Sequence, residues 1–251
     1  MLTADVGRIL LSEVAGTAVL MTLGVGVCAN MTLSRTFGRG GGYLVVAVGW
    51  SLGVFAGVVV AQDSGAHLNP AVTLAILAQS ATADGPTEFA PGIGISLATT
   101  LAYLVAELLG AFLGAVAAWA VYRQHYDAHP VQAEKLASMA TAPAIRSLPT
   151  NVFGEGVATF VLVLVLLLLA QTPSELGPLG MALVVLGVGL GLGGVTGWAI
   201  NPARDLGGRL AHTALPIRGK GGSDWSYAWV PVVGPAVGGV LGGLAAVAIA
   251  T

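Results

Sequence analysis

Two similar hexapeptides hold the polar side chains most able to do chemistry in an otherwise apolar chain. LNPAVT occupies residues 68–73 and INPARD occupies residues 200–205. Asparagine is a favoured N-cap residue and proline a favoured first helical residue, so each Asn-Pro-Ala triplet predicts the start of a helix. A helix N-terminus carries about half a positive charge, and an asparagine amide donates hydrogen bonds. The two triplets therefore predict a hydrogen-bonding site that repels cations; they comprise Asn69, Pro70, Ala71, Asn201, Pro202 and Ala203.

The composition places these triplets in a membrane protein. Hydrophobic residues make up 55% of the chain and charged residues only 9%, with a mean hydropathy of +0.85, outside the range of soluble domains. Apolar runs of about 18 residues or more predict membrane-spanning helices, since none shows the alternation that a barrel needs. The predicted spans are residues 10–33, 43–61, 95–121, 152–170, 177–195 and 228–250.

An internal repeat divides the chain into two halves. Glu-x-x-x-Thr opens the first and fourth spans at Glu13 and Glu155, and Gly-x-x-x-Gly recurs in the third and sixth. An Asn-Pro-Ala triplet follows the second and fifth spans. Each half, about residues 8–122 and 151–250, thus contains three spans, and because three is odd the second half must be inverted in the membrane.

The stretch after each triplet is too short to cross a bilayer. Residues 69–79 and 201–212 predict helices of roughly 16 and 18 Å at about 1.5 Å per residue, whose sum is close to the hydrocarbon thickness of about 30 Å. Two half-helices that meet head to head at the midplane would build one crossing. The sequence therefore predicts an all-α membrane protein with six transmembrane helices and two re-entrant half-helices in a single domain, residues 1–251.

The residues before each triplet predict a path for a solute. They are non-helical, so their carbonyl oxygens could line a water-filled cavity at membrane depth. Glu13 and Glu155 are expected to support these loops by accepting hydrogen bonds from their backbone N–H groups. The predicted carbonyl-bearing residues are Gly65, Ala66, His67, Leu68, Gly197, Trp198, Ala199 and Ile200.

The segments SGAHLNPAVT and GWAINPARD closely resemble the two signature loops of the aquaporin and aquaglyceroporin (major intrinsic protein) family, and the resemblance covers residues 12–250. It implies a right-handed bundle, a homotetramer in which each protomer has its own pore, and passive conduction of water or small polyols across the cell membrane. It also implies that both termini are cytoplasmic.

The resemblance also implies a selectivity filter. Two indoles, an arginine and a glycine would form a wide ring, apolar on two sides and polar on one, in which a glycerol carbon edge rests on the indoles while its hydroxyls receive hydrogen bonds. The matching positions are Trp50, Gly189, Trp198 and Arg204. Further matches to the polyol-conducting branch are Asp205, Arg209 and Pro231.

The sequence thus predicts a channel for glycerol and related small neutral solutes that also conducts water, excludes protons and ions, and needs no cofactor. A water-selective channel is the alternative within the family. A proton-coupled secondary transporter is the alternative from another class, because Glu13, Glu107 and Glu155 could relay protons, although Arg204 and the mid-membrane donors would repel hydronium. Glu107 stands where the family commonly has glutamine, which leaves its protonation state open.

Other classes have little support in the sequence. A net charge of −2 without a basic run gives no reason to expect nucleic acid binding. The single cysteine, Cys28, is interpreted as a small buried side chain. His125 and His129 share the segment 123–150 with two acids, but this segment is predicted to be an aqueous loop, not an enzyme or metal site.

The charge distribution disagrees with the orientation that the resemblance implies. Cytoplasmic termini would leave Arg8 as the only clear basic residue on the inside, whereas the positive-inside rule prefers the reverse. The bases then placed outside are Arg35, Arg39, Arg123, Lys135, Arg146, Arg218 and Lys220.

Overall fold

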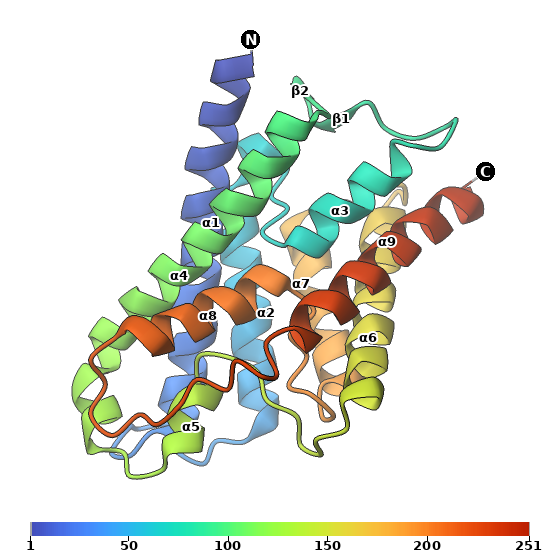
Figure 1. Ribbon diagram of the computed structural model, residues 1–251. Helices are drawn as coiled ribbons and strands as arrows, with labels where there is room; N and C mark the ends of the chain where they lie inside the picture. The colour runs from blue at the N-terminus through green and yellow to red at the C-terminus, as the bar shows by residue number, and fades with distance from the viewer. Residues whose placement is uncertain (1, 251) are drawn as a thin grey trace.

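The computed structural model describes residues 2–250, almost all of them in helices and the loops between them. Two short helices lie in the middle of a bundle of longer ones, with their N-terminal ends facing each other (Figure 1). Both ends of the described chain lie on the side of the bundle that carries a small β-hairpin, opposite to α5 (Figure 1). The elements are α1 (Leu2–Thr32), α2 (Tyr43–Val60), the 3-10 turn η1 (Gln62–Ser64), α3 (Pro70–Gln79), β1 (Glu88–Ala90), β2 (Ile93–Gly94), α4 (Leu97–Ala128), α5 (Gln132–Ala137), α6 (Leu148–Leu169), α7 (Pro178–Leu192), α8 (Pro202–Ala214) and α9 (Val230–Ala250).

Five of the described helices are long and apolar enough to cross a membrane, namely α1, α2, α4, α6 and α9. The fifth predicted span, residues 177–195, is shorter than expected, because α7 has 15 residues and ends at Leu192. The two predicted half-helices are α3, with 10 residues, and α8, with 13. The predicted all-helical membrane fold is confirmed.

The long helices pair in the same way in both halves, α1 with α4 and α6 with α9. A Cβ atom on Gly110 of α4 would lie 2.6 Å from the Val14 carbonyl oxygen, and one on Gly234 of α9 would lie 2.8 Å from that of Val152. Both distances are too short for a side chain. The Gly-x-x-x-Gly patterns therefore permit close helix crossings.

Each half-helix packs against the last long helix of the other half. A Cβ on Gly239 of α9 would lie 2.6 Å from the carbonyl oxygen of Ala71 in α3, and one on Gly207 of α8 would lie 2.5 Å from the Cβ of Ala111 in α4. The two halves are thus interlocked through small residues.

The segment 123–150 is more folded than the loop that its polar residues predict. α4 continues to Ala128, α5 follows, and Met139 and Thr141 are buried. The Thr141 backbone N–H and hydroxyl both donate to Asp205 in α8, at 2.7 and 2.6 Å. The sequence does not predict this folding, because the polar groups of the segment are satisfied by distant protein partners, which a local hydropathy pattern does not reveal.

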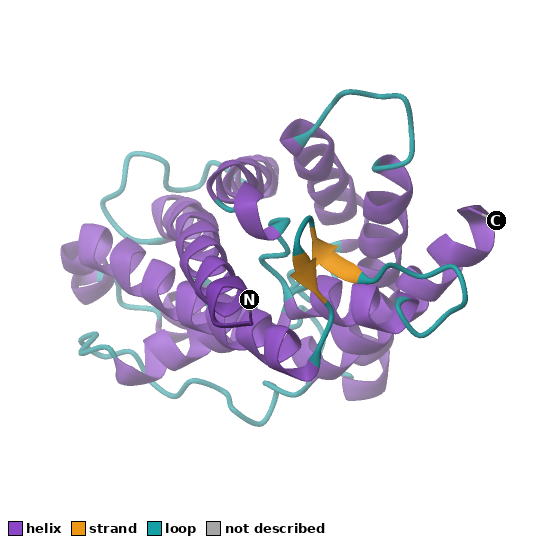
Figure 2. Cartoon of the chain, turned by 90° about the horizontal axis from the view of Figure 1, so that it is seen from above, coloured by secondary structure: helices purple, strands orange, loops and turns teal. Residues whose placement is uncertain are grey.

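The hairpin of β1 and β2 was not predicted. It lies among the helix ends on the side of the N-terminus (Figure 2), where the buried side chain of Phe89 contacts the ring of His67 in the first irregular loop. The hairpin therefore covers the loop that precedes α3.

Candidate functional site

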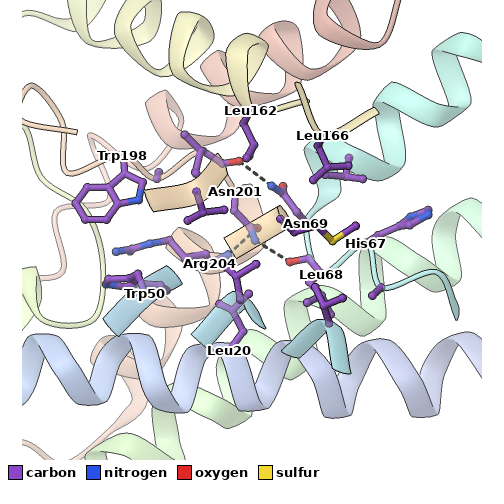
Figure 3. A pocket seen from close by; sticks show the side chains of 18 residues that line it. Leu20, Trp50, His67, Leu68, Asn69, Leu162, Leu166, Trp198, Asn201 and Arg204 are labelled. Atoms are coloured by element: carbon purple, nitrogen blue, oxygen red, sulfur yellow. Dashed lines mark hydrogen bonds between the residues drawn. The ribbon is translucent and has the colours of Figure 1, made fainter. Parts of the chain in front are cut away.

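The two half-helices meet through a reciprocal pair of hydrogen bonds. The Asn69 amide nitrogen donates to the Ile200 carbonyl at 2.8 Å, and the Asn201 amide nitrogen donates to the Leu68 carbonyl at 2.7 Å (Figure 3). Each asparagine side-chain oxygen also accepts a backbone N–H from the first turn of its own helix, at 2.9 and 3.1 Å. Each amide therefore keeps a second N–H that can serve another acceptor.

The loops leading to the half-helices are held by buried carboxylates. Glu13 accepts the backbone N–H groups of His67 and Leu68, at 3.0 and 2.7 Å, and Glu155 accepts those of Ala199 and Ile200, both at 2.9 Å. These bonds offset the cost of a backbone that non-glycine residues rarely adopt. The positive φ angles are 53° at Ala66, 54° at Leu68, 36° at Trp198 and 43° at Ile200.

A cavity of about 60 Å³ runs past the two asparagines, larger than the roughly 10–15 Å³ that one water requires. Most of its wall is apolar. Figure 3 shows the two asparagines near the middle of the lining, His67 toward one end, and Arg204, Trp50 and Trp198 toward the other. Its polar lining side chains are His67, Asn69, Asn201 and Arg204, with Trp50 and Trp198 beside them; its aliphatic lining includes Leu20, Val54, Val58, Val72, Leu162, Leu166, Met181 and Val185.

Arg204 and Trp50 form one side of the cavity. The guanidinium carbon of Arg204 lies 4.2 Å from the centroid of the Trp50 ring, a favourable cation–π geometry. The Nη1 atom of Arg204 is buried and has no acceptor among residues 2–250. Nε and Nη2 of Arg204 have no hydrogen-bond partner among the described residues and are not buried, so an acceptor oxygen on a solute in the cavity could serve them.

Gly189 lies behind Trp198 and does not line the cavity itself. A Cβ atom at Gly189 would lie 3.1 Å from the Trp198 ring, so the missing side chain makes room for the indole. Gly197 is also absent from the lining, and a Cβ there would face Thr141. Gly65, the first residue of the first loop, lines a second cavity of about 410 Å³.

A family sequence model described as Major intrinsic protein matches residues 1–246. The chain belongs to this family. It is 43% identical over 235 residues to the glycerol uptake facilitator protein of Bacillus subtilis, an alignment that covers 92% of this chain and 81% of that one. It is 35% identical to the D/L-lactic acid transporter of Lactiplantibacillus plantarum, covering 92% and 93% of the two chains. The X-ray structure of the aquaglyceroporin from Plasmodium falciparum superposes with a TM-score of 0.77 at 31% identity, covering 95% of this chain and 94% of that one.

In this major intrinsic protein the pair Asp205 and Arg209 lies outside the cavity. Their side chains are fully buried and 2.8 Å apart in an i,i+4 ion pair on α8. Arg209 also donates to the carbonyls of Thr141 and Ser223, at 2.9 and 2.8 Å. The pair therefore anchors two loops to the half-helix. Pro231, at the start of α9, is buried and also does not line the cavity.

Glu107 likewise lies away from the cavity lining. It accepts a hydrogen bond from the Thr73 hydroxyl at 2.8 Å, and that hydroxyl lies 2.8 Å from Nδ1 of His67. The His67 ring stacks on Tyr103 with a centroid distance of 4.2 Å. These contacts fix α3 and its loop against α4.

The two histidines of segment 123–150 bind the backbone of another loop. Nδ1 of His125 lies 3.0 Å from the Ser34 carbonyl oxygen, and Nδ1 of His129 accepts the Ser34 backbone N–H at 3.2 Å. Among residues 2–250 no group of three His, Cys, Asp or Glu side chains could hold a metal ion.

Sequence reasoning missed two contacts at the constriction. The Trp50 indole N–H donates to Sγ of Cys28 at 3.2 Å, and Tyr43 contacts both Gly189 and Trp198. The first contact joins α2 to its neighbour α1, and the second joins α2 to α7 and the second loop, more than 140 residues away in the sequence; no local motif marks either.

Proposed function

We propose that this protein is a passive transmembrane channel for glycerol and related small neutral solutes, which also conducts water and excludes protons and ions. The observation that carries the proposal is the series of donors along an otherwise apolar cavity. Asn69 and Asn201 lie at its centre, and Arg204 lies toward the side of the second loop.

This arrangement suits a solute with hydroxyl groups. The hydroxyl oxygens can accept from the amides and the guanidinium, while the carbon edge of the molecule contacts Trp50, Trp198 and the aliphatic wall. Hydrogen bonds formed in this way offset the loss of the solute's hydration.

The same groups disfavour cations. Two helix N-termini and the guanidinium of Arg204 place positive charge along the path. A hydronium or metal ion would lose its hydration without gaining an anionic partner there. Exclusion of protons and cations follows from this electrostatic barrier.

The relatives support a polyol as the solute, since those in Bacillus subtilis and Thermotoga maritima are named glycerol uptake facilitator and probable glycerol uptake facilitator. A relative named as a lactic acid transporter makes undissociated lactic acid a second solute to test, because it is also small, neutral and hydroxylated. The protein is proposed to act as a homotetramer in the cell membrane, with both termini in the cytoplasm.

The test is stopped-flow light scattering on proteoliposomes against protein-free liposomes. We expect faster glycerol entry than in the controls, faster water flux, and no accumulation above the external concentration with or without a pH gradient. Water flux without glycerol entry would favour a water-selective channel. Accumulation driven by the pH gradient would favour a proton-coupled transporter.

A further inference from the structure

The two indoles at the constriction are held in different ways. Trp50 donates its N–H to Cys28, and the guanidinium of Arg204 lies over its ring. The only polar group of the Trp50 side chain, its indole N–H, therefore already has an acceptor. Trp50 offers a passing solute only carbon surface.

Trp198 keeps its donor free. Its indole N–H has no hydrogen-bond acceptor among residues 2–250, and its nitrogen retains accessible surface, unlike the indole nitrogen of Trp119, which is buried without a partner. Figure 3 shows the nitrogen edge of the ring turned toward the middle of the cavity. A Cβ atom at Gly189 would lie 3.5 Å from this nitrogen, so the glycine leaves the donor uncovered.

Tyr43, the first residue of α2, fixes the orientation of this ring. Its own ring meets Trp198 edge to face, with centroids 5.3 Å apart and planes at 72°, a favourable aromatic geometry. Its hydroxyl donates to the Gly189 carbonyl at 2.8 Å. A side chain at Gly193 would overlap both the Tyr43 hydroxyl and the Trp198 ring, so that glycine completes the slot.

We propose that the Trp198 N–H is a second hydrogen-bond donor to solute hydroxyls beside Arg204, and that Tyr43 is the positioning residue that keeps it directed into the pore. This inference rests on the proposed function, because it concerns how the same constriction distinguishes polyols from water. A polyol in a narrow passage needs several donors at once. A water molecule has fewer groups to satisfy and depends less on any single donor.

The test compares Tyr43→Phe, Trp198→Phe and the double variant, each as the full chain in proteoliposomes. The readout is the ratio of glycerol to water permeability after the values of protein-free liposomes are subtracted, and a loss of folded protein alone does not change this ratio. Trp198→Phe keeps an aromatic ring without the N–H, and we expect the ratio to fall at least about threefold, the effect of losing one net hydrogen bond on a barrier. Tyr43→Phe should lower it at least about twofold, because the indole is no longer held by a tyrosine bound to Gly189.

The double variant tests whether Tyr43 acts through Trp198. We expect its ratio to equal that of Trp198→Phe, because no indole N–H remains to be positioned. Tyr126→Phe is the matched control, since it removes a buried hydroxyl that lies 2.8 Å from Oγ of Ser138 on the loop side of α4. Its ratio should match that of the wild type.

An unchanged ratio in Tyr43→Phe, or effects of the two single changes that multiply in the double variant, would overturn the positioning role. Should Tyr43→Phe fail to fold, Trp198→Phe alone decides, and an unchanged ratio there overturns the inference. If the wild type raises glycerol permeability but the variants give one of these contradicting results, the proposed function stands and the inference is overturned. If the wild type does not raise it, both are overturned.

Discussion

At the scale of single residues, Arg204 is the unusual feature of the site. Its neighbour Asp205 pairs with Arg209, and no carboxylate among the described residues forms an ion pair with Arg204. A guanidinium that is buried against Trp50 without a carboxylate keeps its positive charge for the cavity. Moving a charge out of water in this way is costly, so an unpaired buried guanidinium indicates a functional group.

The position of Gly189 makes a prediction possible at the scale of one residue. In Gly189→His the new side chain must displace the Trp198 ring, because its Cβ would already lie 3.1 Å from the indole. We expect glycerol permeability to fall about tenfold or more and water permeability less than about threefold, since overpacking narrows the passage more for the larger solute. Stopped-flow measurements on the same vesicles give both values.

Gly191→His is the matched control for this change. It places the same side chain on the same helix, where a Cβ would have nothing within 4 Å, and both permeabilities should stay near the wild-type values. Equal losses of glycerol and water flux in Gly189→His would contradict the assignment of Gly189 to the filter.

At the scale of elements, the sequence predicts the half-helices well. The predicted starts at Asn69 and Asn201 agree with their positions as N-caps of α3 and α8, and the expected hydrogen bonds from the loops to Glu13 and Glu155 are present. These features are predictable because capping is local and because the repeat supplies each of them twice.

The elements that the sequence does not predict depend on distant contacts. The β-hairpin lies in a stretch rich in turn residues, and its Phe89 is buried only because the hairpin packs on another loop. Lys135 of α5 is 2% exposed and donates to the Arg218 carbonyl. From the sequence alone, a lysine such as Lys135 is expected to be exposed to solvent, because its distant partner is not known.

Lys220 supports α8 from outside the membrane-spanning helices. Its ammonium group donates to the carbonyls of His212, Thr213 and Leu215, at 2.7, 2.6 and 2.7 Å, where the helix ends and its dipole is negative. We expect Lys220→Met to lower the free energy of unfolding by about 1–2 kcal/mol through these lost bonds. Thermal unfolding in detergent measures the change.

Arg39→Met serves as the control for Lys220→Met. Arg39 is an exposed base whose side chain makes one hydrogen bond to the described residues, at 3.3 Å to the Ser34 hydroxyl. The loss of this bond should change the free energy of unfolding by less than about 0.5 kcal/mol. Equal stability of the two variants would show that Lys220 does not hold the end of α8.

At the scale of the whole molecule, interlocking explains why two short helices are stable in the middle of the bundle. α3 packs on α9 and α8 packs on α4, so each half-helix is held by the half of the chain to which it does not belong. Asn69 and Asn201 then join the two halves directly. Residues of both halves line the cavity, so it forms only where the two halves pack together.

The same scale bears on the orientation in the membrane. The bases that conflict with the positive-inside rule include Lys135, Arg146 and Lys220, and each binds a protein group. Lys135 donates to the backbone carbonyl of Arg218, Arg146 pairs with the Asp224 carboxylate at 2.8 Å, and Lys220 donates to carbonyls at the end of α8. The rule describes basic residues in short loops as topogenic charges. Here the bases are needed where they are to hold folded loops, which weakens the count as an argument against cytoplasmic termini.

Labelling of single engineered cysteines tests the orientation directly. Ser174 lies in the connection between α6 and α7, on the side of both termini, and Arg39 lies in the connection between α1 and α2, on the opposite side; both are exposed. We expect a membrane-impermeant maleimide added to intact cells to label Arg39→Cys at once and Ser174→Cys only after permeabilisation. The native Cys28, which is 8% exposed and hydrogen-bonded to Trp50, should stay unlabelled. The reverse pattern would place the termini outside, and the basic loops would then follow the positive-inside rule after all.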